Sequence, residues 1–308
     1  MKKQRAIGAV VFLLAGMLPG CKRIHEGAAW DGAGGNTSIT AEAVEAKTDG
    51  EGQGKTVGDT KAVAGEGPVE LVVFAAASLT GPLDVIAQTY EETNPGVDII
   101  YTFDSSGTLK TQIEEGADCD IFISASQTLM DQLDGSADRG ANKGGPDLIR
   151  QGTRVDLVGN QIVLAVPKGN PAGITSFEDL GTDKLSLVCI GNDDVPAGSY
   201  ALEVLDHLGL LGQLMSDAKI TYGSNVKEVA AQIKEASVDC GIIYATDAFS
   251  AGLAVVDEAG QGQCRQITYP AAVIKNSKNQ KEAQAFLDYL VTEDCAAVFE
   301  AAGFSMAE

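Results

Sequence analysis

Four short segments of this 308-residue sequence place small or hydroxyl-bearing residues where an apolar, strand-like run gives way to a helical pattern. They are residues 75–78 (Ala-Ala-Ala-Ser), 105–107 (Ser-Ser-Gly), 195–198 (Val-Pro-Ala-Gly) and 224–225 (Ser-Asn). The start of a helix offers unpaired backbone N–H groups and the positive end of the helix dipole. Small side chains let a ligand approach those groups, and serine adds a hydroxyl donor. Several such helix starts at one point would bind an anion without lysine or arginine.

Helix capping is the competing explanation for each segment taken alone. Ser78, Ser106 and Asn225 are favourable N-cap residues, and a cap is worth about 1 kcal/mol without any ligand. Four segments of one design in one chain favour the binding interpretation. In open α/β sheets such junctions gather at one edge of the sheet, where ligands bind.

Alternating strand and helix patterns form the framework that would position these segments. The predicted strands are 69–76, 97–103, 120–125, 161–167, 186–190, 241–245 and 267–275. The predicted helices are 79–93, 108–115, 200–208, 226–236, 280–290 and 293–301. This order predicts an α/β protein with largely parallel sheets flanked by helices. Residues 112–122 and 232–243 repeat one arrangement, a helix end, a turn, an Asp-Cys pair and a buried strand, which suits two similar lobes with a ligand cleft between them.

The composition excludes several classes of function. The chain has 22 Lys+Arg against 43 Asp+Glu and a formal charge of -21, whereas a nucleic-acid backbone requires a basic surface. The only histidines are His25 and His207, and the cysteines lack metal-ligand spacing, so we expect no protein-ligated metal and no cofactor. The number of disulfides is not readable from the sequence.

The N-terminus reads as an export signal. Residues 1–5 are basic and residues 6–18 are apolar but short for a transmembrane helix, so residues 1–20 are predicted to be a signal peptide. Residues 18–21 (Leu-Pro-Gly-Cys) resemble a bacterial lipobox, which implies lipidation of Cys21; the alternative is an ordinary secretory signal. Residues 21–67 are rich in Gly, Ala, Thr and acidic residues, which predicts a flexible tether. We expect an exported protein that is membrane-anchored on the outer face or periplasmic.

Five motifs resemble one known family in the order in which they occur. They are 74–80 (Phe-Ala-Ala-Ala-Ser-Leu-Thr), 103–109 (Phe-Asp-Ser-Ser-Gly-Thr-Leu), 120–125 (Asp-Ile-Phe-Ile-Ser-Ala), 195–201 (Val-Pro-Ala-Gly-Ser-Tyr-Ala) and 241–248 (Gly-Ile-Ile-Tyr-Ala-Thr-Asp-Ala). Together they look like the molybdate-binding proteins of bacterial ABC importers, over about residues 69–304. The resemblance implies a two-lobed periplasmic-binding-protein fold of type II with the ligand in the interlobe cleft. Lobe 1 would comprise 69–158 plus 268–308, and lobe 2 would comprise 159–267.

The resemblance also implies which groups bind the oxyanion. The family's serine hydroxyls fall on Ser78 and Ser106, its backbone N–H donors fall on Ala197 and Val226, and its tyrosine hydroxyl falls on Tyr244. The ligand would be molybdate, and tungstate as well, with sulfate or another tetrahedral oxyanion as the alternative. Asp104, two residues before Ser106, is expected to point outward or to cap nearby amides.

The implied partners are an ABC permease and its cytoplasmic ATPase, with a lipid anchor as the sole membrane attachment, and we expect a monomer. A serine hydrolase using Ser78 is a remote alternative from another class. The pattern Gly-x-Ser-x-Gly is absent around Ser78, and His207 lies in an amphipathic helical pattern, so no base is evident. We therefore expect a binding protein and no enzyme.

Overall fold

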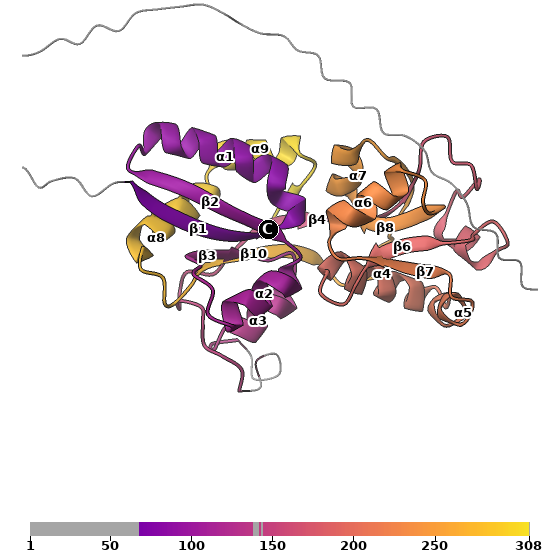
Figure 1. The fold of residues 1–308 in the computed structure, drawn as a ribbon, viewed down its shortest axis with the longest axis horizontal. Coiled ribbons are helices and arrows are strands. Elements are labelled where there is room, and N and C mark those ends of the chain that lie inside the picture. The colour runs from indigo at the N-terminus through magenta and orange to yellow at the C-terminus, as the bar shows by residue number, and fades with distance from the viewer. Residues whose placement is uncertain (1–67, 138–141, 143, 308) are drawn as a thin grey trace, which may run out of the picture. The chain divides into compact units, whose positions relative to one another are not determined.

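The computed structural model describes residues 68–137, 142 and 144–307 (Figure 1). The predicted signal peptide 1–20, the lipidation site Cys21 and the tether 21–67 lie outside these residues, so they stay predictions. Every element described below belongs to the unit Val63–Glu308. Among the described residues, no helix is long and apolar enough to cross a membrane.

The first sheet has six strands in the order β11-β4-β10-β3-β1-β2. Its strands are β1 (Val69–Ala76), β2 (Val97–Asp104), β3 (Ile121–Ile123), β4 (Val155–Asn160), β10 (Ile267–Val273) and β11 (Ser305–Met306). Side chains alternate across β1, so Leu71, Val73 and Ala75 join one apolar cluster and Phe74 joins another. Helices on both faces cover these two clusters.

On the face of Leu71, the sheet is covered by η1 (Ala77–Leu79), α1 (Thr80–Thr93), α8 (Gln280–Leu290) and α9 (Glu293–Ala301). The face of Phe74 is covered by α2 (Ser106–Glu114) and α3 (Gln127–Leu133), which lie together beneath the sheet in Figure 1. The helix α1 shows why the sequence folds in this way: Leu83, Ile86, Ala87 and Tyr90 recur at helical spacing, and all are buried.

The second sheet has five strands in the order β7-β6-β8-β5-β9. They are β5 (Ile162–Val166), β6 (Val188–Gly191), β7 (Ile220–Gly223), β8 (Cys240–Tyr244) and β9 (Ala254–Glu258). One face packs on α4 (Pro196–His207) with α5 (Leu211–Ser216) and η2 (Phe177–Gly181) nearby. The other face packs on α6 (Val226–Lys234) and α7 (Ala245–Ala251).

The predicted α/β fold with two helix-flanked sheets is confirmed, but the sheets are mixed rather than largely parallel. Parallel pairing joins β1 to β2 and β3, and joins β6 to β7 and β8, whereas β10, β4, β11, β5 and β9 pair antiparallel. The reason is that β4, β5, β9 and β10 carry the chain from one sheet to the other. A strand reached without a crossover helix is free to pair antiparallel.

The chain passes between the sheets at two places. Only Gln161 separates β4 from β5, and residues 259–266 separate β9 from β10. The lobe boundaries inferred from the sequence stay a prediction; in the structure the first sheet continues to Asn160 and resumes at Ile267.

The residue directly before the buried strand has the same role in each copy of the internal repeat, although in the first copy it is Asp120 and not Asp118 of the Asp-Cys pair. A carboxylate oxygen of Asp120 accepts a hydrogen bond from Val72 N at 2.8 Å, and an oxygen of Asp239 accepts from Ser186 N and Leu187 N at 2.6 and 2.9 Å. Each aspartate thus precedes a buried strand and binds the backbone of a neighbouring segment. All five cysteines in the described part of the chain are free thiols.

Candidate functional site

A small cavity lies between the two sheets, at the N-terminal ends of several of the helices that flank them. Residues from η1 and α2 line it on one side, and residues from α4, α6 and β8 line it on the other. Its lining consists of Ala76, Ala77, Ser78, Asp104, Ser105, Ser106, Ala125, Val195, Pro196, Val226 and Tyr244. The cavity measures about 10 Å³, which on this measure is about the room of one water molecule.

Ser78 lies in the 3-10 turn η1 directly after β1. Its side chain is buried, and its Oγ lies 3.0 Å from the Tyr269 hydroxyl. The capping explanation is wrong for this residue, because Leu79 is the N-cap of α1 and Ala76 is that of η1. The Ser78 hydroxyl is therefore not engaged by its own helix, and the residue lines the cavity.

Ser106 is likewise not a cap. Ser105 is the N-cap of α2, and its Oγ accepts from Thr108 N at 3.1 Å. Ser106 follows as the first helical residue, is fully buried, and its Oγ accepts a hydrogen bond from Ala125 N at 3.0 Å. Because that N–H can only donate, the Ser106 hydrogen remains available to an acceptor in the cavity.

The second sheet contributes Val226 and Tyr244 to the lining, as the resemblance implied, whereas Ala197 is not in the lining. Val226 is the first residue of α6, which is capped by the Asn225 side chain through Lys227 N and Glu228 N. Ala197 is the second residue of α4, directly behind Pro196. Tyr244 is buried, and its hydroxyl donates to Ala125 O at 3.5 Å. Oxyanion binding by all five predicted residues stays a prediction.

Direct contacts hold the two sides of the cavity together. Gly107 N donates to Asp194 O at 2.9 Å, and Asn225 Nδ2 donates to Asp104 Oδ1 at 3.5 Å. The same oxygen of Asp104 accepts from Ser105 N at 2.7 Å, so this carboxylate caps a nearby amide, as expected.

The electrostatic character of the lining is neutral apart from Asp104. Of the described residues, none with a basic side chain lines the cavity. Burial, and then the neighbouring Tyr269, raise the pKa of Tyr244, and burial, followed by Asp247, raises the pKa of Tyr269. Both phenols therefore keep their protons at neutral pH and can act as hydrogen-bond donors, as Tyr244 does to Ala125 O.

Asp247, in the first turn of α7, is a buried carboxylate close to this site. Lys227 Nζ lies 3.1 Å from its Oδ1, yet neither carboxylate oxygen has a hydrogen-bond partner among the described residues. The contact is an ion pair. Burial raises the pKa of Asp247, and Lys227 opposes that rise only in part.

This raised pKa predicts a pH-dependent stability. Between the ordinary carboxyl pKa and the raised folded value, the folded protein holds a proton that the unfolded chain has lost, so the free energy of unfolding falls as pH rises through that window. The slope is at most about 1.4 kcal/mol per pH unit for one proton. Urea unfolding of wild type and Asp247→Asn at a series of pH values measures it: the variant should lack this decline, and Lys227→Met should extend it to higher pH. If the free energy of unfolding changed with pH in the same way for all three proteins, Asp247 would not be the group responsible.

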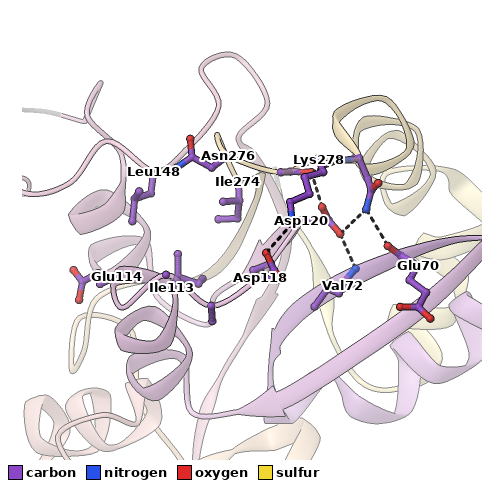
Figure 2. Close-up of a pocket in the computed structure, with 15 residues that line it drawn as sticks. Glu70, Val72, Ile113, Glu114, Asp118, Asp120, Leu148, Ile274, Asn276 and Lys278 are labelled. Atoms are coloured by element: carbon purple, nitrogen blue, oxygen red, sulfur yellow. Dashed lines mark hydrogen bonds and ion pairs between the residues drawn. The ribbon is translucent and has the colours of Figure 1, made fainter.

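A larger cavity of about 540 Å³ lies at the opposite end of β1 (Figure 2). Asp120 is its central polar residue, and its oxygens accept from Val72 N at 2.8 Å, Ser277 Oγ at 2.5 Å and Asn279 Nδ2 at 3.2 Å. Figure 2 shows dashed contacts around the carboxylate of Asp120, among them the one to Val72. Asp120 thus connects two strands to the loop before α8, which is a structural role.

The fold is a two-lobed periplasmic-binding-protein fold of type II. Two sheets are joined by two crossing segments, and helices of both lobes begin around a small cavity that is neutral apart from Asp104. The chain belongs to the family described as bacterial extracellular solute-binding proteins, which matches residues 71–305.

Curated relatives are similar over most of their length. The molybdate-binding protein ModA of Escherichia coli (strain K12) is 35% identical over 252 residues, covering 80% of this chain and 91% of the relative. A Bacillus subtilis (strain 168) protein, YvgL, provisionally named an ABC transporter substrate-binding lipoprotein, is 35% identical over 242 residues, covering 78% and 88%. The solved periplasmic molybdate-binding protein of Azotobacter vinelandii has a TM-score of 0.67 at 22% identity, covering 77% of this chain and 100% of that one, and this likeness concerns the fold.

The sequence analysis did not identify three residues that belong to the hydrogen-bond network of the site. Tyr269 contacts Ser78, Asn160 contacts Tyr269, and Ala125 contacts both Ser106 and Tyr244. Tyr269 lies within the predicted strand 267–275, where a tyrosine among apolar residues was the only available signal. Asn160 carries no local signal, because its contact with Tyr269 spans 109 positions in the sequence.

Proposed function

We propose that this protein is an extracytoplasmic receptor for molybdate, and for tungstate as well, that delivers the oxyanion to an ABC permease driven by a cytoplasmic ATPase. The observation that carries the proposal is the pair Ser78 and Ser106, two buried hydroxyls freed from helix capping at one neutral interlobe cavity. The similarity to the molybdate-binding protein of E. coli supports the choice of ligand.

Apart from Asp104, whose Oδ1 accepts from Ser105 N and Asn225 Nδ2, the lining is neutral, which suits a fully deprotonated dianion. Hydrogen bonds to a charged group are worth about 1.5–3 kcal/mol each, so a few donors give tight binding after ordering costs. A protonated oxyanion such as hydrogen phosphate would bring an O–H that finds no acceptor among such donors, which disfavours it.

Ligand entry requires the two lobes to separate. A four-oxygen anion needs more room than about 10 Å³, and the contacts from Gly107 to Asp194 and from Asn225 to Asp104 lie across the entry. Gln161 and residues 259–266 are the segments through which hinge bending would occur.

Isothermal titration calorimetry on the full chain, refolded to remove bound anion, tests the ligand. We expect one-to-one, submicromolar binding of molybdate and tungstate, and much weaker binding of sulfate and phosphate, each titrated separately at neutral pH. Preference for sulfate would keep the binding mode and replace the ligand. No binding of any of the four would overturn the proposal.

A binding protein, and not a hydrolase, is the interpretation that the geometry of Ser78 supports. The hydrogen-bond partner of Ser78 is a phenol whose pKa is raised by burial, which is a poor general base. His207 is the exposed last residue of α4 and is not in the cavity lining.

We further propose that the chain is exported and anchored by lipidation of Cys21, with the segment 21–67 as its tether, and that it acts as a monomer. The lipobox-like segment 18–21 supports the anchor, as does the similarity to YvgL. Mass spectrometry of the protein from bacterial membranes, compared with Cys21→Ala, tests the anchor; an unmodified Cys21 would overturn it.

A further inference from the structure

Each of the two cavity serines has a hydrogen-bond neighbour at its hydroxyl, but the two neighbours are of different kinds. For Ser106 the donor is the backbone N–H of Ala125, which has one possible polarity. For Ser78 the neighbour is the Tyr269 hydroxyl, 3.0 Å away, and two hydroxyls at this distance could donate in either direction. The direction decides whether the Ser78 hydrogen points to Tyr269 or to the cavity.

Asn160 settles the direction through its amide group. Gln161 N, which can only donate, lies 2.8 Å from the Asn160 oxygen Oδ1, so this atom is the acceptor and the other end of the amide is the NH₂ group. That Nδ2 lies 2.9 Å from Thr246 Oγ1 and 3.1 Å from the Tyr269 hydroxyl. The oxygen of Tyr269 therefore accepts from Asn160.

Tyr269 must then donate to Ser78. Of the two hydrogen bonds that the Tyr269 hydroxyl makes among the described residues, only the one to Ser78 Oγ can take its hydrogen, because Asn160 Nδ2 is a donor. The neighbouring Tyr244 hydroxyl donates to Ala125 O, and the Asp247 oxygens make no hydrogen bond there. Tyr269 is fully buried, so water does not compete for this hydrogen. With its oxygen accepting from Tyr269, Ser78 directs its own hydrogen to the cavity that it lines.

We propose that Tyr269, oriented by Asn160, is a positioning residue that fixes the Ser78 hydroxyl as a donor toward the bound oxyanion. The inference rests on the proposed function. It also assigns a role in specificity, since a Ser78 hydroxyl without this partner could rotate and accept from a protonated oxyanion. Tyr269 lies on β10 and Asn160 ends β4, so the residues that orient the donor stand beside the segments that join the lobes.

A double-mutant cycle on the full chain separates this role from a structural one. Tyr269→Phe should weaken molybdate binding about tenfold, as expected for an impaired hydrogen bond to a charged ligand. In the Ser78→Ala background the same change should alter the affinity less than about twofold, because no hydroxyl remains to be oriented. Calorimetry with molybdate and with phosphate should also show that Tyr269→Phe lowers the ratio of the two affinities.

The matched control is Tyr101→Phe, which also removes a hydrogen bond, from the phenol to Leu83 O at 3.1 Å, but is remote from the lining. It should leave the molybdate affinity unchanged. If Tyr269→Phe does not fold, Asn160→Ala acts on the same chain of hydrogen bonds, and its effect should likewise vanish in the Ser78→Ala background.

The outcomes distinguish the two proposals. If wild type binds molybdate but the affinity losses of Ser78→Ala and Tyr269→Phe simply add in the double variant, the role of Tyr269 is overturned and the proposed function stays intact. Absence of oxyanion binding by wild type would overturn both.

Discussion

The double variant Ser78→Ala, Ser106→Ala is expected to lose between about 10² and 10⁴ of its molybdate affinity. Each serine offers a hydroxyl hydrogen to a charged ligand, and each such bond is worth about 1.5–3 kcal/mol. The loss cannot be made good by water, because both side chains are buried and the cavity is small. Calorimetry or competition against a labelled oxyanion measures the affinity.

Ser105→Ala is the matched control for this variant. Ser105 lines the same cavity and directly precedes Ser106, but its hydroxyl donates to Thr108 Oγ1 at 2.7 Å and accepts from Thr108 N at 3.1 Å. Removing the Ser105 hydroxyl should lower the free energy of unfolding by about 1 kcal/mol, because a helix cap is lost, and should leave the molybdate affinity nearly unchanged. Equal affinity losses in Ser105→Ala and in the Ser106→Ala single variant would contradict the assigned donors.

Local sequence signals located the helices at the cavity but not all of their first residues: α2 begins at Ser106 instead of residue 108, and α4 begins at Pro196 instead of residue 200. Strand β1 and helices α8 and α9 have the predicted bounds, because each is a complete apolar pattern with clear ends. The segment 105–107 predicted a capped helix, but backbone geometry decides whether Ser105 or Ser106 is the N-cap residue. Ser105 is that residue, and this leaves Ser106 to the cavity.

Elements stabilised by distant contacts could not be predicted. Only half of strand β4 (Val155–Asn160) is apolar, and pairing with β10 and β11 defines it as a strand. Its antiparallel pairing follows from where the chain crosses between sheets, which no local pattern encodes. The contact of Tyr269 with Ser78 joins residues 191 positions apart, so the polarity of that hydroxyl is a property of the fold.

Gly107→Ala is expected to weaken molybdate binding at least about tenfold, the equivalent of one lost hydrogen bond to a charged ligand. A Cβ at this position would lie 2.5 Å from Asp194 O and 2.7 Å from Asp194 Cα, both backbone atoms of the other lobe. Neither can move as a flexible side chain would, so the lobes must stand further apart and the hydrogen bond from Gly107 N to Asp194 O is lost. Donors on the two sides then no longer reach one anion together.

Gly81→Ala separates this effect from a change in helix stability. Gly81 lies in the first turn of α1, as Gly107 lies in that of α2, but a Cβ there would meet no atom within 4 Å. Both substitutions favour the helix itself by up to about 1 kcal/mol, so neither should lower the melting temperature through helix propensity. Small-angle X-ray scattering with saturating molybdate should show wild type and Gly81→Ala contracting on binding and Gly107→Ala remaining more expanded. If Gly107→Ala contracts and binds as wild type does, the approach of α2 to Asp194 is not what closes the site.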